Sequence, residues 1–315
     1  METMNKLRAA VVGVGYLGRF HAQKYAACSG SELVAVVDAR ADVARQVAAE
    51  CGGRAETDYR VLAGQIDVAS VATTTPYHCE VASWLLQAGV HVLVEKPITT
   101  TLDEASKLIE LARKHGRVLQ VGHLERFNPA LRAAEPLLHS PRFIECHRLA
   151  PFRERGTDVN VVLDLMIHDI DLLQSLVRSD VVSLDAVGAP VFSGETDIAN
   201  ARLRFANGCV ANVTASRVSM KTERKMRIFM EEGYLSIDLQ QKILTSIRKR
   251  ELAAGEAGLP VSIDEQSFEQ GDALRAEIEA FLAACRGECP PAVSGEDGRR
   301  ALQLAIEITE RLKAQ

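Results

Sequence analysis

The segment from Asp158 to Val177 is apolar almost all round except for one polar stripe. Its polar residues recur at steps of four, four, three and four, which places them on one face of an α-helix. They are Asn160, Asp164, His168, Asp171 and Ser175. Burying carboxylates and an imidazole is costly unless they are paired or face a polar cavity. The stripe therefore predicts a site for acid–base chemistry, since an imidazole titrates near neutral pH. The alternative is a solvated helix face with Asp158 as N-cap.

A second group of candidate residues belongs to a parallel α/β pattern. Short β-branched runs alternate with helical stretches from Leu7 to Gly122, with strands expected over residues 9–14, 33–37, 68–72, 91–95 and 117–121. The first strand opens into Gly13-x-Gly15-x-x-Gly18, and Asp38 ends the second. This context predicts a doubly wound Rossmann sheet that binds the pyrophosphate of a dinucleotide at a helix N-terminus.

Asp38 bears on which dinucleotide binds. Its carboxylate would accept hydrogen bonds from ribose hydroxyls and repel a 2′-phosphate, which favours NAD over NADP. Arg40, two residues on, could instead meet a phosphate, so NADP stays open.

Two later strand ends complete the predicted crevice, because ligands of such folds bind outside the carboxyl ends of the strands. One is the run 72–78, and the other is Glu95-Lys96-Pro97, where Lys96 could equally be a solvated strand end. The residues expected to contact the cofactor are Gly13, Gly15, Tyr16, Leu17, Gly18, Asp38, Arg40, Thr73, Thr74, Thr75, His78, Glu95 and Lys96.

After Gly122 the periodicity becomes that of an antiparallel sheet with one covered face. Residues 200–205 and 209–216 alternate polar and apolar around the hairpin signal Asn207-Gly208, and residues 224–230 and 234–239 continue the pattern. A long polar loop is expected over 240–270, and helices over 272–286 and 295–313. The predicted domains are 1–122 for the dinucleotide and 123–315 for substrate and oligomerisation.

Composition excludes several classes of protein. The 315-residue chain has a net charge of −5 and no dominant basic patch, which argues against a nucleic-acid partner. No apolar run reaches the roughly 18 residues that span a bilayer, and the N-terminus lacks the apolar core of a signal peptide, so a cytoplasmic location is expected. The seven cysteines include no Cys-x-x-Cys pair, and the Cys285/Cys289 spacing is expected to be incidental, so no metal site is predicted.

Three motifs, Gly13-x-Gly15-x-x-Gly18, Glu95-Lys96-Pro97 and Asp164-x-x-x-His168, resemble those of the glucose-fructose oxidoreductase and inositol dehydrogenase family, Gfo/Idh/MocA. The resemblance runs along nearly the whole chain. It implies oxidation of a sugar or cyclitol hydroxyl, and an α+β C-terminal domain with a large open antiparallel sheet. Because that sheet often packs on another subunit in the family, a homo-oligomer is expected, either a dimer or a tetramer.

The resemblance also carries catalytic roles over to Lys96, Asp164 and His168. His168 would remove the hydroxyl proton, Asp164 would orient the imidazole, and Lys96 would bond the developing alkoxide. Whether Lys96 or His168 finally holds the proton stays open. Many members have glycines before the helix and at the position of Met166, so the backbone there is expected to differ.

Longer strings, at 121–129, 147–152, 155–158 and 163–171, are similar to the bacterial branch of the family that oxidises the C3 hydroxyl of UDP-N-acetylglucosamine. That similarity implies a 3-keto sugar nucleotide, which an aminotransferase converts for amide-linked lipid A of lipopolysaccharide. The arginines of the segment 148–155 suit a diphosphate, with a solvated loop as the equal alternative. The expected substrate contacts are Lys96, Arg126, Asn128, Arg148, Arg155, Asn160, Asp164 and His168.

Other functions stay open beside this one. Within the enzyme class they are a dehydrogenase for the corresponding uronic acid, or a plain sugar or inositol dehydrogenase. A non-catalytic dinucleotide sensor is the alternative from another class, because a fold alone does not establish function. The presence of Lys96, Asp164 and His168 favours the enzyme.

Overall fold

The computed structural model describes residues 6–153, 159–252, 258–268 and 271–314. The chain divides into two compact units. Unit 1 comprises Met1–Leu124 and Asp272–Leu302, and unit 2 comprises Glu125–Gly271 and Gln303–Gln315.

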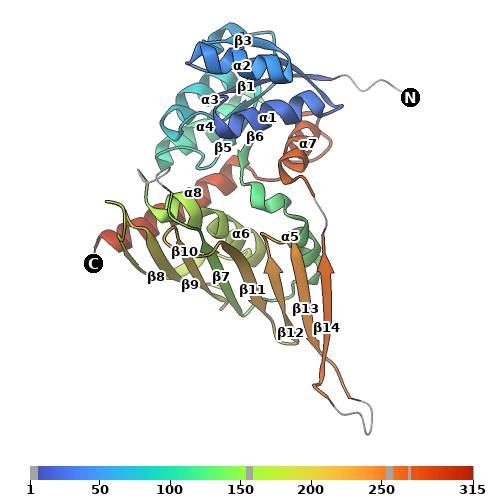
Figure 1. The fold of residues 1–315 in the computed structure, drawn as a ribbon, viewed down its shortest axis with the longest axis vertical. Coiled ribbons are helices and arrows are strands. Elements are labelled where there is room, and N and C mark those ends of the chain that lie inside the picture. Colours follow the sequence, from blue (N-terminus) through green and yellow to red (C-terminus); the bar gives the residue numbers. More distant parts are fainter. Residues whose placement is uncertain (1–5, 154–158, 253–257, 269–270, 315) are drawn as a thin grey trace. The chain divides into compact units, whose positions relative to one another are not determined.

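Unit 1 is built on a parallel sheet, for which the described residues supply six strands in the order β3-β2-β1-β4-β5-β6 (Figure 1). This is the strand order of a doubly wound dinucleotide-binding fold, as the sequence predicts. The strands are β1 (Leu7–Val12), β2 (Ser31–Val37), β3 (Arg54–Glu56), β4 (Val68–Val71), β5 (His91–Glu95) and β6 (Leu119–Gly122).

The crossover helices of unit 1 pack in pairs, α1 with α2 and α3 with α4. They are α1 (Tyr16–Ala27), α2 (Ala41–Cys51), α3 (His78–Gln87) and α4 (Leu102–His115). Local signals fix their ends. In α4, for example, Thr101 and Glu104 form a capping box at the start, and Gly116 ends the helix at a φ of 60°.

Helix α7 (Ala273–Cys285) belongs to unit 1 although it lies far along the chain. Its Leu274, Ile278 and Phe281 are buried in one apolar cluster with Ala9 and Val11 of β1. The expected second domain, 123–315, therefore differs from the structure, where Asp272–Leu302 joins unit 1. An apolar helix face indicates burial but does not say against which core.

Unit 2 is built on a second sheet, for which the described residues supply eight strands in the order β14-β13-β12-β11-β7-β10-β9-β8. Every neighbouring pair is antiparallel except β7 and β10, which run parallel. The strands are β7 (Phe143–Leu149), β8 (Val181–Ala189), β9 (Ile198–Phe205), β10 (Val210–Ser216), β11 (Glu223–Phe229), β12 (Gly233–Asp238), β13 (Ile243–Lys249) and β14 (Val261–Ser267).

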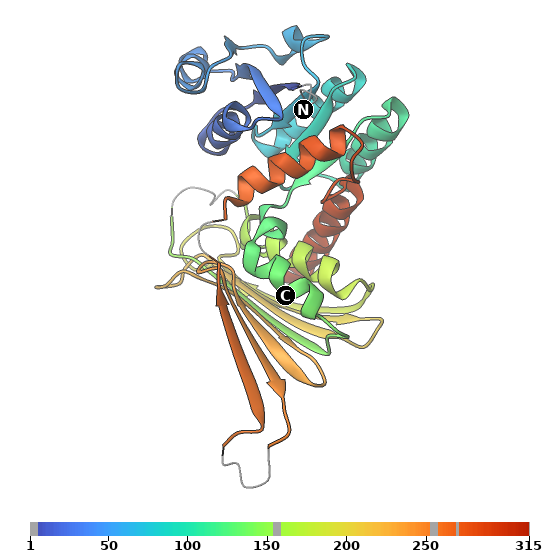
Figure 2. The same cartoon turned by 90° about the vertical axis from the view of Figure 1, so that its right-hand side faces the viewer.

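Short helices cover one face of this sheet (Figure 2). Helix α5 (Pro129–Ala134) contacts β12 and β13, and α6 (Ile167–Val177) contacts β10. The last helix, α8 (Gly295–Lys313), begins in unit 1 and ends in unit 2. The predicted hairpin is present, since Asn207 and Gly208 join β9 to β10 and Gly208 has a φ of 88°.

The expectation of a long loop over 240–270 is wrong, because β13 and β14 form an antiparallel pair there. Strand β14 lies at the sheet edge, and most of its residues are exposed. An edge strand exposed on both faces needs no apolar alternation, so its sequence pattern is that of a loop. Among the described helices, none is long and apolar enough to span a bilayer.

Candidate functional site

The glycine loop between β1 and α1 has the geometry of a phosphate cradle. Gly13 has a φ of 84°, and a Cβ there would lie 2.5 Å from the backbone nitrogen of Thr73. A Cβ on Gly18 would lie 1.8 Å from the Gly13 carbonyl oxygen. At Gly15, by contrast, a Cβ would meet nothing within 4 Å. The absence of a Cβ at Gly13 and Gly18 therefore allows the loop to pack closely on itself and on the strand ends. At Gly15 it leaves open space beside the backbone.

The start of α1 is suited to an anion. Gly15 is its N-cap residue and has no side chain to bond the first backbone N–H groups, which are donors that phosphate commonly accepts from. Tyr16 and Leu17 form the first turn, with Tyr16 67% exposed. A cavity of about 470 Å³ adjoins this turn, lined in part by Gly15, Tyr16, Arg19, Phe20 and Arg40.

Asp38 follows β2 and is tied to the glycine loop. Its Oδ2 accepts from the Val14 N–H at 3.1 Å, and its Oδ1 accepts from the Arg40 N–H at 3.0 Å. The Arg40 guanidinium lies 3.7 Å from the same carboxylate and is 68% exposed. The loop thus holds an acceptor beside the cradle, where an adenosine ribose binds in this fold.

The loops after β4 and β5 are joined by His78. Its two ring nitrogens lie 2.9 Å from the Pro97 carbonyl oxygen and 3.0 Å from that of Thr73, and the residue is 1% exposed. His78 therefore positions the loops, and its expected contact with the cofactor stays a prediction. Thr73 itself has a buried hydroxyl with no hydrogen-bond partner among the described residues. Thr74 and Thr75 begin the short helical turn at Thr75–Tyr77.

Glu95 and Lys96 differ in environment although they are adjacent. Glu95 is 8% exposed, and its Oε1 lies 2.9 Å from His21 Nε2. Its Oε2 accepts from the Lys96 N–H at 3.3 Å. Lys96 is half-buried at the carboxyl end of β5. Glu95 therefore points into unit 1, and its expected cofactor contact is not supported, whereas Lys96 stands at the edge where ligands bind.

The polar stripe of unit 2 does not lie on one regular α-helix. Residues Val162–Met166 form a π-helical turn, and α6 begins only at Ile167. Asp164 lies in the π turn and His168 in the first turn of α6, both half-buried. The π turn lies where we expect the backbone to differ from that of family members with a glycine at the position of Met166. Such turns occur often at functional sites. They do not have the 3.6 residues per turn on which the prediction of a single polar face depends.

Asn160 caps this helical segment. Its Oδ1 accepts from the N–H groups of Val162 and Leu163, both at 3.1 Å, and its Nδ2 donates to Thr309 at 3.3 Å. It is 7% exposed. Both polar atoms of its side chain are engaged internally, which supports a capping role, and the expected substrate contact at Asn160 stays a prediction. Asp158, the alternative cap, lies outside the described residues.

Two of the arginines expected to contact the substrate, Arg126 and Arg148, form largely buried ion pairs. Arg126 makes two hydrogen bonds of 2.7 Å to Asp171. Arg148 makes bonds of 2.9 and 2.8 Å to Asp169 and one of 2.8 Å to Glu125. Burial alone would lower the pKa of Arg148, but these carboxylates raise it above its ordinary value.

Arg126 and Arg148 therefore have a positioning role in this structure, and their expected contacts with the substrate stay a prediction. Asp169 and Asp171 lie on α6, one and three residues after His168. Holding both carboxylates fixes the rotation of the helix that carries the imidazole. The third expected arginine, Arg155, lies outside the described residues, and Arg153 of the same segment is exposed.

Asn128 also has a structural role. Its Oδ1 caps α5 by accepting from the Ala130 N–H at 3.1 Å, and its Nδ2 donates to the Leu239 carbonyl at 2.8 Å. The expected substrate contact there is not supported, since the residue is 6% exposed.

Sequence reasoning missed Asp169 and Glu125, the partners of Arg148, because neither belongs to the stripe. Only once Arg148 is known to be buried in its strand does it require such carboxylate partners.

Comparison with known proteins identifies the family to which this chain belongs. Residues 7–123 match the family model described as an oxidoreductase family with an NAD-binding Rossmann fold, and residues 140–236 match the model of the Gfo/Idh/MocA C-terminal domain. The chain is also 41% identical over 313 residues to UDP-N-acetylglucosamine 3-dehydrogenase of Acidithiobacillus ferrooxidans, covering 99% of both chains. The chain belongs to the Gfo/Idh/MocA oxidoreductase family.

Two solved structures and a further relative are similar to this chain over nearly its whole length. The solved structure of the Acidithiobacillus ferrooxidans enzyme has a TM-score of 0.92 with 39% identity and 99% coverage of both chains. Scyllo-inositol dehydrogenase from Lactobacillus casei, solved with NAD(H) and scyllo-inositol, has a TM-score of 0.82 at 19% identity, with 98% of both chains covered. Myo-inositol 2-dehydrogenase of Thermotoga maritima is 24% identical over 98% of this chain and 96% of its own.

Membership confirms three predictions made from the sequence: the family, the α/β fold class with its Rossmann domain, and a dehydrogenase activity. The NAD-binding assignment agrees with the cradle, because the glycine loop has the geometry that fits a pyrophosphate.

Proposed function

We propose that this oxidoreductase oxidises the C3 hydroxyl of UDP-N-acetylglucosamine to the 3-keto sugar nucleotide, with NAD as the hydride acceptor. The similarity to the Acidithiobacillus ferrooxidans enzyme carries the proposal, because identity of 41% extends over 99% of both chains. The inositol dehydrogenase of Thermotoga maritima aligns over a similar length with only 24% identity.

Asp38 supports NAD as the cofactor. Two backbone N–H groups hold its carboxylate beside the glycine loop, so the acceptor is in place before a ribose arrives. A 2′-phosphate would bring further negative charge to this carboxylate. Arg40 lies beside Asp38 and already compensates its charge at 3.7 Å, so it does not present an isolated cation to NADP.

Three residues are proposed to carry the chemistry. His168 removes the proton of the sugar hydroxyl, and Asp164, earlier in the same helical segment, orients the imidazole. Lys96 donates a hydrogen bond to the oxygen on which negative charge develops. When bound, NAD supplies the nicotinamide carbon that accepts the hydride.

The proposed reaction also implies a metabolic role, a cellular location and an oligomeric state. The keto product is a substrate for an aminotransferase, and the resulting amino sugar would enter amide-linked lipid A of lipopolysaccharide. We propose that the enzyme acts in the cytoplasm as a homo-oligomer, a dimer or tetramer formed through the sheet of unit 2. The face of that sheet opposite α5 and α6 is consistent with such packing, as no helix of unit 2 covers it among the described residues (Figure 2).

A substrate panel tests the proposal. The full-length protein is incubated with NAD and, separately, UDP-N-acetylglucosamine, its uronic acid analogue, free N-acetylglucosamine and myo-inositol, and the absorbance of reduced nicotinamide is followed. UDP-N-acetylglucosamine should be oxidised fastest, with a further increase when a keto-sugar aminotransferase removes the product. Free N-acetylglucosamine should be poor, because binding energy from the nucleotide helps position the reacting sugar. Faster oxidation of the uronic acid or of inositol contradicts the proposed substrate.

A further inference from the structure

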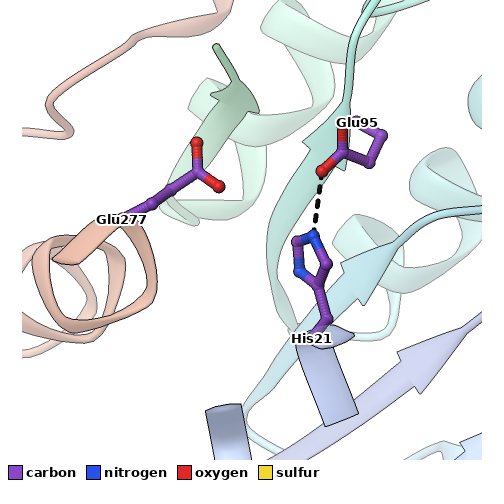
Figure 3. Close-up of side chains that lie close together, drawn as sticks. All are labelled: His21, Glu95 and Glu277. Atoms are coloured by element: carbon purple, nitrogen blue, oxygen red, sulfur yellow. Dashed lines mark hydrogen bonds and ion pairs between the residues drawn. The ribbon is translucent and has the colours of Figure 1, made fainter. Parts of the chain in front are cut away.

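Unit 1 buries a group of titratable side chains that the proposed reaction does not use. His21 comes from α1, Glu95 from the end of β5 and Glu277 from α7. They are 0%, 8% and 0% exposed. One ligand atom from each lies within 4.8 Å of the other two, and Figure 3 shows the Glu277 carboxylate directed toward the other pair.

Glu277 carries a buried carboxylate without a hydrogen-bond partner among the described residues. Both of its carboxylate oxygens are buried without a hydrogen bond from any described residue. The adjacent Gln120 donates its Nε2 to the Glu277 backbone carbonyl at 3.4 Å, while its Oε1 is likewise buried and unbonded. Burying an unpaired carboxylate costs far more than burying a neutral polar group, and a second acceptor beside it adds to that cost.

His21 is arranged as a metal-binding imidazole usually is. Its Nδ1 lies 3.0 Å from the Ser70 hydroxyl, which in turn lies 3.0 Å from the Tyr25 hydroxyl. Its Nε2 faces Glu95 Oε1 at 2.9 Å. In metal sites a hydrogen bond at one ring nitrogen fixes the ring so that the other nitrogen can bind the ion.

The surroundings leave space for Glu95 but offer little charge compensation. A Cβ on Gly122 would lie 2.9 Å from Glu95 Oε1, so only glycine leaves this carboxylate its position. The described partners of these three side chains are the Ser70 hydroxyl, the Lys96 backbone N–H and one another, and neither of the first two carries a charge. Burial, together with the charge of Glu95, accordingly raises the pKa of Glu277 well above its ordinary value.

We propose that His21 Nε2 and the carboxylates of Glu95 and Glu277 bind one divalent transition-metal ion, with zinc as the best match. Its two positive charges balance the two carboxylates, and an imidazole ligand favours zinc over magnesium or calcium. At bond lengths of about 2.1 Å, tetrahedral ligands stand roughly 3.4 Å apart, so His21 and Glu95 separate slightly while Glu277 approaches. A water molecule completes the four ligands.

The site joins α1, β5 and α7, and we infer that the ion is structural. It would attach α7 to the sheet and steady Glu95, whose Oε2 accepts from the Lys96 N–H. No motif spacing reveals these ligands, because they come from three elements far apart in sequence. The inference does not depend on the sugar that the enzyme oxidises.

Metal binding to the full-length protein tests the site. After stripping with a chelator, the protein is dialysed against zinc or magnesium, and bound metal and thermal midpoint are measured. One zinc per chain should bind and raise the midpoint, whereas magnesium should do neither. Glu277→Gln should weaken zinc binding by about 100-fold or more, because it removes a direct ligand. Glu279→Gln, on the same helix but with an exposed side chain, is the control and should bind zinc like the wild type.

Two results would overturn the site. One is wild-type protein that binds no zinc, which would leave Glu277 a neutral buried acid. The other is equal zinc binding by wild type and Glu277→Gln, which would place the ion elsewhere, such as at the exposed Cys289. If Glu277→Gln does not fold, X-ray absorption of the zinc-loaded wild type decides: nitrogen and oxygen ligands support the site, and sulfur ligands refute it.

Discussion

The glycine loop of unit 1 and the polar stripe of unit 2 show equally regular spacing, but the spacing means different things in the two regions. In the loop, the residue types are set by backbone atoms of the same turn and of the adjacent strand end, as for Gly18 against the Gly13 carbonyl. In the stripe, Asn160 is bonded to Thr309, 149 residues away, and Asp171 to Arg126, 45 residues away. Spacing identifies residues that share a face, but it does not identify what that face meets.

The largest expected effect tests the internal role of the unit 2 arginines. Arg148→Ala would leave Asp169 and Glu125 buried without their cation, which should lower the free energy of unfolding by about 3–5 kcal/mol. Arg142→Ala is the control, since its ion pair with Glu231 is 69% and 70% exposed and should contribute at most about 1 kcal/mol. Urea unfolding measures both. If Arg148→Ala is as stable as the wild type and only its KM for the UDP-sugar is raised, Arg148 binds the substrate and does not mainly stabilise the fold.

Next in size is the loss of the proposed catalytic groups, one from each unit. Lys96→Ala and His168→Ala should each lower kcat by about 100-fold or more, the range for a lost acid–base or electrostatic group. NAD affinity, measured by fluorescence titration, and the unfolding midpoint should stay near wild type. Full turnover in both variants would remove these residues from the mechanism.

A smaller effect is expected at the glycine loop. Asp38→Ala should weaken NAD binding by about 1–3 kcal/mol, because it removes a charged hydrogen-bond acceptor, and should narrow the preference over NADP. Arg40→Ala is the matched variant. If Arg40 only compensates the charge of Asp38, this substitution should change the affinity for NADP little. Wild-type preference for NADP, or loss of NADP use in Arg40→Ala alone, would make Arg40 the determinant.

The contrast between the regions also shows how far the sequence predicts the molecule. The Rossmann fold of unit 1 and the hairpin at Asn207-Gly208 follow from signals carried by neighbouring residues, whereas the three-residue strand β3 is not among the expected strands. Strand β14 has the sequence pattern of a loop because an exposed edge strand needs no apolar alternation. The periodicity of α7 indicates a buried face but does not say which core that face contacts, so its unit is predicted wrongly. The buried ion pairs of Arg126 and Arg148 were likewise hidden, since a charged residue in sequence gives no sign of its burial.

The smallest expected effect separates a cap from a ligand at Asn160. Asn160→Ala should cost about 0.5–2 kcal/mol of stability, because the N–H groups of Val162 and Leu163 lose their acceptor. Asn160→Asp keeps that acceptor and loses only the bond from Nδ2 to Thr309, so it should recover most of the difference. A cap should also affect turnover, since it holds the π turn that carries Asp164, while the KM for the UDP-sugar stays constant. If Asn160 instead contacted the sugar nucleotide, both variants would raise KM with stability unchanged. Thermal unfolding and steady-state kinetics of the pair therefore decide whether the first residue of the stripe serves the helix or the substrate.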